Sequence, residues 1–265
     1  MQIISWIEYI SIILYAAAFV FAWFKLSNES ALPNAVYAIL GIAMVLHGYL
    51  SYQLIDGGEG QNLSLLNVFT MTTWIAMLLT VWNVIRHQAG SLLIVTLPIV
   101  ISGLIAVTFL NQQKILNIDH SVSLLHILFG ILAMSLMLLV AIQSVLVLYL
   151  DKGLRSKPAK IYPWLGSLES MERFLVQLVT LGFTFVTCSL VFVIWLPDDL
   201  KSAQVLHKIV LTIASWLVLG YVMYGRFVKG WRGVSAAKIS LLGVLLLLVG
   251  YFGSKLVMEY ILANG

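Results

Sequence analysis

Long apolar runs alternate with short polar stretches along the whole chain. Each run has about 20 residues, and an α-helix of that length, rising 1.5 Å per residue, crosses a hydrocarbon core about 30 Å thick. The short alternating segments that build an outer-membrane barrel are missing. The pattern therefore predicts eight membrane-spanning helices, at Ile3–Phe24, Asn34–Ile55, Asn67–Ile85, Ser91–Leu110, Val122–Leu150, Phe174–Leu196, Val205–Tyr224 and Lys238–Tyr260.

The composition agrees with this pattern. Hydrophobic residues make up 61% of the chain and charged residues 10%, whereas soluble domains are about half apolar and a quarter charged. We expect an all-α polytopic membrane protein, with residues 1–265 forming a single integral membrane domain. No lysine or arginine precedes Lys25 and no small-residue cleavage site follows the first run, so that run is expected to be a retained span rather than a signal peptide.

The lysines and arginines predict the orientation. With the N-terminus outside, the inner connections contain eleven of them and the outer side four, and an even number of spans returns the C-terminus to the outside. Positive residues favour the cytoplasmic side, which explains the net charge of +4 without a nucleic-acid partner. The inner set is Lys25, Arg86, Lys152, Arg155, Lys157, Lys160, Arg173, Arg226, Lys229, Arg232 and Lys238, and the outer set is Lys114, Lys201, Lys208 and Lys255.

One cytoplasmic connection, Asp151–Arg173, is longer than the others. Its end, "GSLESMERFLVQL", has apolar residues at helical spacing, and Ser167 is suited to cap the start of a helix. We expect an amphipathic cytoplasmic helix leading into the sixth span. It could lie at the membrane interface and set the entry angle of that span, or it could form a docking surface for a partner.

Reaction chemistry is not visible in the sequence. Cys188 is the single cysteine, which excludes an intramolecular disulfide, a thiolate zinc site and covalent c-type haem attachment within the chain. There is no G-x-S-x-G, Walker or H-E-x-x-H motif and no close carboxylate pair inside a span. We therefore expect a protein that is not an enzyme.

Histidines are the candidate ligands. His47 lies in the second span, about 12 Å from its outer end at 1.5 Å per residue, and His126 lies about one turn into the fifth span. His120 and His207 are also expected on the outer side, while His87 is expected in the cytoplasm. Imidazole binds metals and haem iron, so His47 and His126 could be haem or metal ligands. Each could instead form a hydrogen bond to a neighbouring helix.

The stretch "DGGEGQNLSLLNV", Asp56–Val68, is a polar connection predicted on the outer side. Its glycines permit turns with positive φ, and the side chains of Gln61, Asn62, Ser64 and Asn67 offer hydrogen-bond donors and acceptors. The segment could form a lid, with the start of the third span beneath it favouring an anion such as a haem propionate. Alternatively, Asn62 or Ser64 merely caps that span.

A resemblance to a known family starts at "HKIVLTIASWLVLGYVMYGRFVKGWRG", His207–Gly233. Lys208, Trp216, Arg226 and the Gly230–Gly233 turn resemble a segment of the cytochrome c assembly proteins, the CcsA, CcmC and HemX-like family. There an outer loop runs into a span that ends in a G-W-R-G turn. The passage "HILFGILAMSLMLL", which begins at His126, is similar to the family's span that opens with an outward-facing histidine.

Within the family, Asp56, Gly57 and the run Gly60–Val68 resemble a signature of the YpjD-type inner-membrane group. The resemblance implies a multi-pass protein of the inner (plasma) membrane that handles haem near its outer face and delivers it to apocytochrome c. Other cytochrome assembly or membrane proteins are the implied partners. The residues then expected at the haem site are His47, His126, Gln61, Asn62, Trp216 and Arg232, with His47 and His126 as the iron ligands.

This chain departs from the haem-carrying relatives in its histidines and in its outer loop, which is reduced to "PDDLKSAQVLHK" with no tryptophan between Trp195 and Trp216. Tyr224 stands where their second membrane histidine is expected, and "FGSKLVMEYILANG" near the C-terminus has no histidine. Two alternatives therefore remain beside haem binding. One is an accessory protein that has no cofactor and acts through a partner. The other is a small-molecule transporter, although the spans lack paired charges.

The expected depths of the two histidines give a geometric prediction. At about 1.5 Å per residue, His47 lies about 12 Å and His126 about 6 Å from the outer boundary, and helix tilts near 20° absorb part of the difference. We expect both side chains to line one outward-opening cavity with "GQNLSLLNV" at its rim. They could still be too far apart to hold one iron together, in which case each awaits a second ligand.

Overall fold

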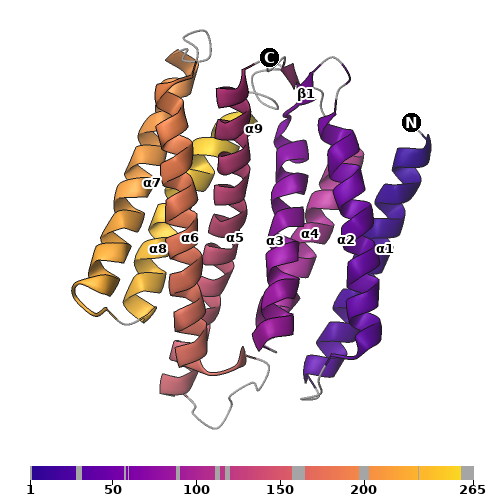
Figure 1. Ribbon diagram of the computed structural model, residues 1–265. Helices are drawn as coiled ribbons and strands as arrows, with labels where there is room; N and C mark the ends of the chain where they lie inside the picture. Colours follow the sequence, from indigo (N-terminus) through magenta and orange to yellow (C-terminus); the bar gives the residue numbers. More distant parts are fainter. Residues whose placement is uncertain are drawn as a thin grey trace. The chain divides into compact units, whose positions relative to one another are not determined.

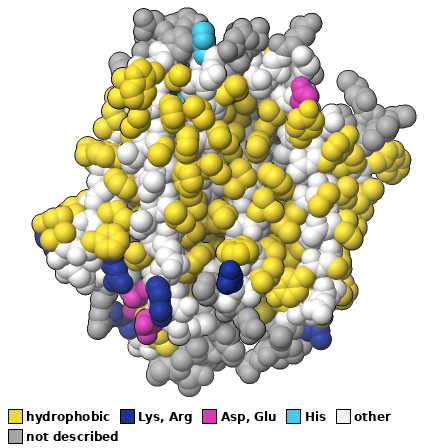
Figure 2. All heavy atoms as spheres, in the orientation of Figure 1, with side chains coloured by type: hydrophobic (Ala, Val, Ile, Leu, Met, Phe, Trp, Pro, Cys, Tyr) yellow, Lys and Arg dark blue, Asp and Glu magenta, His cyan; other side chains and the backbone are white. Residues whose placement is uncertain are grey.

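The computed structural model confirms the all-α membrane architecture (Figure 1). It describes residues 2–27, 32–56, 58, 60–87, 90–110, 114–116, 120–156, 165–196, 203–231 and 233–257. Eight helices in these ranges are long and apolar enough to cross a membrane. Apolar side chains cover the visible faces of the helices along their length, as Figure 2 shows, and such surfaces suit a lipid environment. The chain divides into two compact units, and the prediction of one integral domain stays a prediction.

Unit 1 contains residues 1–117 and 158–166. Its helices are α1 (Gln2–Ser27), α2 (Asn34–Ile55), α3 (Leu65–His87) and α4 (Ser91–Leu110). Helix α1 packs against α2 and α4, and α3 packs against α4 and α2. The core between them is formed by apolar side chains such as Leu40, Met77, Leu97 and Leu104. Hydropathy alone predicted these helices to within a few residues.

Two short strands join the loops at one end of unit 1. Strand β1 (Gln61–Asn62) pairs antiparallel with β2 (Ile115–Leu116), so that Gln61 lies opposite Leu116 and Asn62 opposite Ile115. The sequence analysis did not predict this ribbon, because two-residue strands are too short for an alternating pattern. The pairing ties the α2–α3 connection to the segment that follows α4.

Unit 2 contains residues 118–157 and 167–265. Its elements are α5 (Ser121–Ser156), α6 (Leu168–Ile194), α7 (Ala203–Phe227), α8 (Gly233–Leu248), the π-helix η3 (Val249–Gly253) and α9 (Ser254–Leu256). Helix α5 packs against both α6 and α8, and α7 packs against α8 and α6. The π-turn η3 interrupts the last span, and Lys255 follows it as a buried residue.

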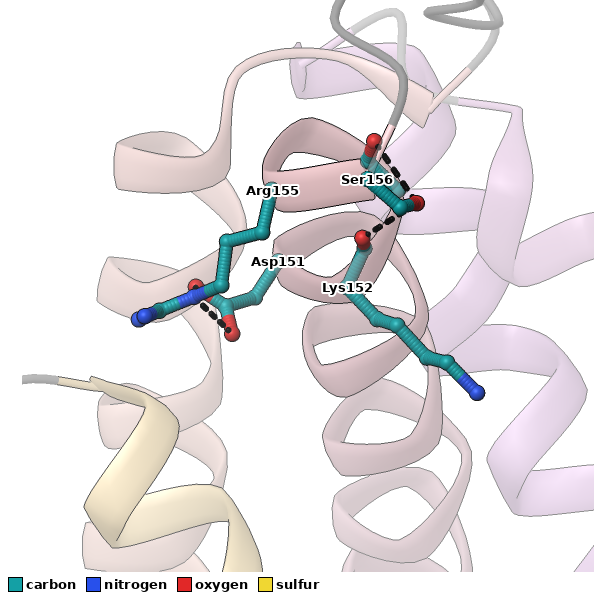
Figure 3. A network of polar contacts seen from close by, with 5 residues as sticks. Asp151, Lys152, Arg155 and Ser156 are labelled. Carbon is teal, nitrogen blue, oxygen red and sulfur yellow. Dashed lines mark hydrogen bonds and ion pairs between the residues drawn. The ribbon is translucent and has the colours of Figure 1, made fainter.

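Helix α5 has 36 residues and continues past the predicted end of the fifth span at Leu150. Its last turn is polar (Figure 3): Arg155 Nε donates to both carboxylate oxygens of Asp151 at 3.1 and 3.0 Å, and Ser156 Oγ donates to the carbonyl of Lys152 at 2.9 Å. Arg173 lies in the second turn of α6 and Arg226 in the last turn of α7. The positive-inside rule favours the cytoplasmic side for these arginines, and the orientation stays a prediction.

The predicted amphipathic segment is helical and starts where expected. Ser167 has an extended backbone, and its Oγ accepts a hydrogen bond from the Ser170 amide at 3.2 Å. Glu169 and Arg173 form an exposed ion pair at 3.2 Å, whereas Met171 and Leu175 are buried. The helix continues without interruption into the sixth span, so the segment forms the first two turns of α6 rather than a separate interfacial helix.

Candidate functional site

His47 is fully buried in unit 1, where α1, α2 and α3 meet. The phenol oxygen of Tyr15 on α1 lies 3.3 Å from His47 Nδ1. The backbone of Thr70 on α3 lies beside the imidazole ring, but Nε2 has no hydrogen bond of good geometry within the described residues. Because the phenol hydrogen needs an acceptor and Nδ1 is beside it, this arrangement favours the tautomer with its proton on Nε2.

Asn62 is a central residue of the loop above α3. Its Oδ1 accepts from the Ser64 amide at 3.3 Å and from the Lys114 amide at 2.9 Å, and the residue is buried. The second of these bonds reaches the segment that carries β2. Gln61 is half-buried, and its Oε1 has no partner in the described part of the chain. Asn62 therefore acts as a hydrogen-bonding anchor for the loop.

Asn67, in the first turn of α3, connects this loop to α2. Its Nδ2 donates to the carbonyl of Leu54 at 2.7 Å and to the carbonyl of Asn62 at 3.3 Å. The Leu54 carbonyl lies in the last turn of α2, where helix carbonyls lack partners in their own helix. Asn67 thus satisfies the end of α2. Of the two capping candidates, Ser64 Oγ has no partner among the described groups, whereas Asn62 Oδ1 accepts from the Ser64 amide directly before α3.

His126 lies in unit 2, in the first two turns of α5, and is half-buried. Its Nδ1 lies 3.0 Å from the backbone oxygen of Ser189 on α6 and 3.2 Å from the Ser189 hydroxyl. A carbonyl can only accept, so Nδ1 carries the ring proton in the first of these contacts. The lone pair is then on Nε2. Metal-binding histidines commonly donate their other ring nitrogen to a backbone carbonyl in this way.

Three phenylalanines lie one helical turn from His126 or from Ser189. Phe129 follows His126 by one turn of α5, and Phe185 and Phe192 lie one turn on either side of Ser189. The ring of Phe129 is 5.8 Å from that of Phe185 and 5.5 Å from that of Phe192, with the latter pair stacked at 16°. This group of rings is an apolar surface one turn from His126 along α5, of a kind that suits a flat hydrophobic group.

Trp216 is placed on another side of α6. Its indole Nε1 donates to Thr187 Oγ1 at 2.9 Å, and its ring stacks on Phe183 with centroids 5.6 Å apart. Thr187 and Ser189 are two residues apart, which separates their directions on a helix by about 200°. The structure therefore does not bring Trp216 to His126. Within the described residues, its contacts join α7 to α6.

The G-W-R-G turn is a compact connection between α7 and α8. Trp231 donates from its backbone amide to the Gly225 carbonyl at 3.0 Å, and its own carbonyl accepts from Arg226 at 2.8 Å. The Trp231 ring lies against Gly225 and meets Tyr221 edge to face at 5.0 Å. Gly230 has φ of 65°, a conformation that favours glycine. Arg232, predicted to contact haem, lies outside the described residues.

The remaining predicted positions are scattered. His120 is exposed, and its carbonyl accepts from the Ser123 and Leu124 amides at the start of α5. Tyr224 is 49% exposed, with the Lys229 ammonium over its ring. His87 and His207 lie in helices, but their side chains are outside the described part of the structure.

His47 and His126 belong to different units, so the predicted shared cavity stays a prediction. In the described ranges, no three His, Cys, Asp or Glu residues gather to hold a metal ion. The sequence analysis missed Tyr15 and Ser189, which carry no charge. It also missed Glu8, a buried carboxyl of α1 that is hydrogen-bonded to Thr108 of α4; as an ionisable residue within an apolar run, it could have been found.

Comparisons with known proteins cover most of the chain. Residues 34–262 match a protein family described as "Cytochrome C assembly protein". The inner membrane protein YpjD of Escherichia coli is 27% identical over 237 residues, which is 88% of each chain. The cytochrome c biogenesis protein CcsA of Chlamydomonas reinhardtii is 25% identical over 138 residues, 51% of this chain and 38% of its own length.

A third relative is an uncharacterised 28.8 kDa protein of Azospirillum brasilense, 28% identical over 144 residues, which is 52% of each chain. No solved structure matches the chain significantly.

Proposed function

Because the chain belongs to the cytochrome c assembly protein family, we propose that it is an inner-membrane protein that binds haem and passes it on during cytochrome c maturation. The relative named as an inner membrane protein and the relative named for cytochrome c biogenesis support this role. The proposed role is binding and transfer rather than catalysis. Its partners would be haem and an apocytochrome or another assembly protein.

The contact between His126 and Ser189 carries the proposal. A backbone carbonyl 3.0 Å from Nδ1 holds the imidazole in place and leaves the Nε2 lone pair for an iron ligand bond. The rings of Phe129, Phe185 and Phe192 offer apolar contact area to a porphyrin. When bound, haem would supply the iron that accepts this lone pair.

His47 fits this role less well than His126. Its burial leaves no exposed ring surface, and the contact with Tyr15 favours a proton on Nε2, the atom that would otherwise bind iron. Ligation through His47 would require the ring proton to move from Nε2 to Nδ1. It would also require the surrounding helices to separate so that haem could reach the ring. We therefore propose His126 as the primary haem ligand and His47 as the secondary candidate.

The absorbance spectrum of the protein purified in detergent, oxidised and reduced, tests this function. We expect a haem spectrum in the wild type, its loss in His126→Ala and its retention in His47→Ala. His120→Ala is the matched control, because His120 is exposed six residues earlier and uses its carbonyl, not its ring, in the described hydrogen bonds. A wild-type protein that neither purifies with haem nor takes up added haemin would contradict the proposal.

An accessory role through a partner is the second candidate. The ion pairs Asp151–Arg155 and Glu169–Arg173, with exposed Arg155, Glu169 and Arg173, give unit 2 a polar end surface that a partner could recognise. Crosslinking from residues of this surface in native membranes should then capture a specific membrane protein. Capture of that partner by a haem-free His126→Ala variant would favour this second role.

A further inference from the structure

The facing sides of α2 and α3 hold a row of buried polar atoms without partners. Two hydrogen bonds fix the helices at its ends: Trp74 Nε1 donates to the Met44 carbonyl at 2.8 Å, and Asn67 Nδ2 donates to the Leu54 carbonyl at 2.7 Å. Between these ends lie His47 and Ser51 on α2, and Thr70 on α3, at spacings of three or four residues. Such spacing puts each set on one helix face.

Three side-chain atoms of this row have no hydrogen-bond partner in the described residues: Ser51 Oγ, Asn67 Oδ1 and Thr70 Oγ1. A fourth, His47 Nε2, has no hydrogen bond of good geometry, although the Thr70 backbone lies beside its ring. All four residues are at most 2% exposed. Of the ten such atoms in the described part of the chain, seven belong to residues between 47 and 72. The cluster is therefore a local property of the α2–α3 contact and its loop.

Two buried hydroxyls deeper in unit 1 behave differently. Thr80 on α3 donates to the carbonyl of Ala76 at 2.8 Å, and Thr96 on α4 donates to that of Leu92 at 2.8 Å. Hydroxyls in helices commonly satisfy themselves in this way. The hydroxyls of Ser51 and Thr70 do not, although both residues lie on the row between α2 and α3. An unsatisfied polar group there costs about 1–3 kcal/mol, and ordered water is the usual partner of such groups.

We propose that this row is hydrated, with ordered water molecules bound between Ser51, Asn67, Thr70 and His47 Nε2, so that solvent reaches the buried imidazole from the loop end of α2 and α3. Tyr15 is the titratable side chain that meets His47 from α1, and the facing side of α3 contributes Thr70 and Asn67, which carry no charge. His47 Nε2 would donate to the innermost water. The proposal does not depend on haem binding.

Cysteine accessibility tests the row. In a Cys188→Ala background, Ser51→Cys and Thr70→Cys should react with a small water-soluble methanethiosulfonate at least about tenfold faster than Thr80→Cys and Thr96→Cys, because the reactive thiolate forms only where water reaches the thiol. The control residues are equally buried, but their hydroxyls bond to their own helices. His120→Cys serves as the exposed positive control. If positions 51 and 70 react as slowly as 80 and 96 while position 120 reacts, the row is dry.

Radiolytic footprinting of the wild-type protein gives a second measurement without substitutions. Hydroxyl radicals form from bound water, so His47 on α2 should be oxidised faster than Met77 on α3, which is equally buried. Methionine is oxidised readily, which makes Met77 a demanding control. Oxidation of Met77 without oxidation of His47 would overturn the proposal.

Discussion

Tyr15 and His47 meet across the α1–α2 contact: the phenol oxygen lies 3.3 Å from Nδ1, and the two rings cross edge to face at 81° with centroids 5.7 Å apart. Both side chains are fully buried. Each provides the other with a polar partner inside an apolar unit, which is the condition under which such groups are tolerated in a membrane.

Tyr15→Phe should therefore destabilise unit 1. It keeps the ring contact but removes the hydroxyl, so we expect a loss of about 1 kcal/mol in the free energy of unfolding. Unfolding in mixed micelles measures it. Tyr9→Phe on the same helix is the matched control, because Tyr9 is 43% exposed; equal losses in the two variants would show that the contact contributes nothing.

Asn67→Asp should have a larger effect than Asn67→Leu. The aspartate keeps the shape but replaces the donor Nδ2, which lies 2.7 Å from the Leu54 carbonyl, with an oxygen that repels it. We expect Asn67→Asp to cost roughly 2 to 3 kcal/mol, measured by the same unfolding assay. Asn34→Asp at the exposed start of α2 should be nearly neutral. A neutral Asn67→Asp would argue against the hydrogen bond to α2.

Gly225→Ala should disturb the connection between α7 and α8. A Cβ at this position would overlap the ring of Trp231, and overpacking of this kind costs about 1–3 kcal/mol. Gly41→Ala in α2 is the control, since no atom lies within 4 Å of its Cβ position, and alanine there should be neutral or stabilising by up to about 1 kcal/mol. Thermal stability in detergent compares them. A Gly225→Ala protein as stable as Gly41→Ala would contradict the close packing.

Trp216 and Thr187 should be coupled to each other and not to haem. In a double-mutant cycle with Trp216→Phe and Thr187→Val, the 2.9 Å hydrogen bond predicts a coupling of about 1 kcal/mol. Trp216→Phe keeps the stacking on Phe183 and should leave any haem spectrum unchanged. A spectral shift in Trp216→Phe would instead support the predicted contact between Trp216 and the cofactor.

The sequence predicted those features that depend on local chemistry. Apolar length located eight spans, and Ser167 before a helical pattern predicted the start of α6, where its side chain indeed accepts from Ser170. These features need only the residues themselves and the thickness of a bilayer. The ends were less accurate, because helices such as α5 continue for several residues past the apolar run.

The neighbours of each histidine were beyond the sequence. Membrane helices are apolar on most faces, so hydropathy does not reveal which helices touch. The sequence therefore could not show that His47 contacts Tyr15 or that His126 contacts Ser189. In the structure, the polar atoms of each pair lie within hydrogen-bonding distance, at 3.3 Å and 3.0 Å. The placement of His47 and His126 in separate units has the same origin. The sequence gives the position of a residue along its own span, whereas it does not identify the adjacent span.

The π-turn Val249–Gly253 has a consequence for how this chain can change over evolution. A π-turn accommodates about one residue more than an α-turn, so everything after it is rotated by about a quarter of a turn relative to an uninterrupted helix. Lys255 is buried in that rotated segment. Deleting a single residue from 249–253 would restore the α-helix and swing the lysine towards a different face. Homologues with a one-residue gap at this place should therefore lack a lysine at the equivalent position, because the ammonium would then face hydrocarbon.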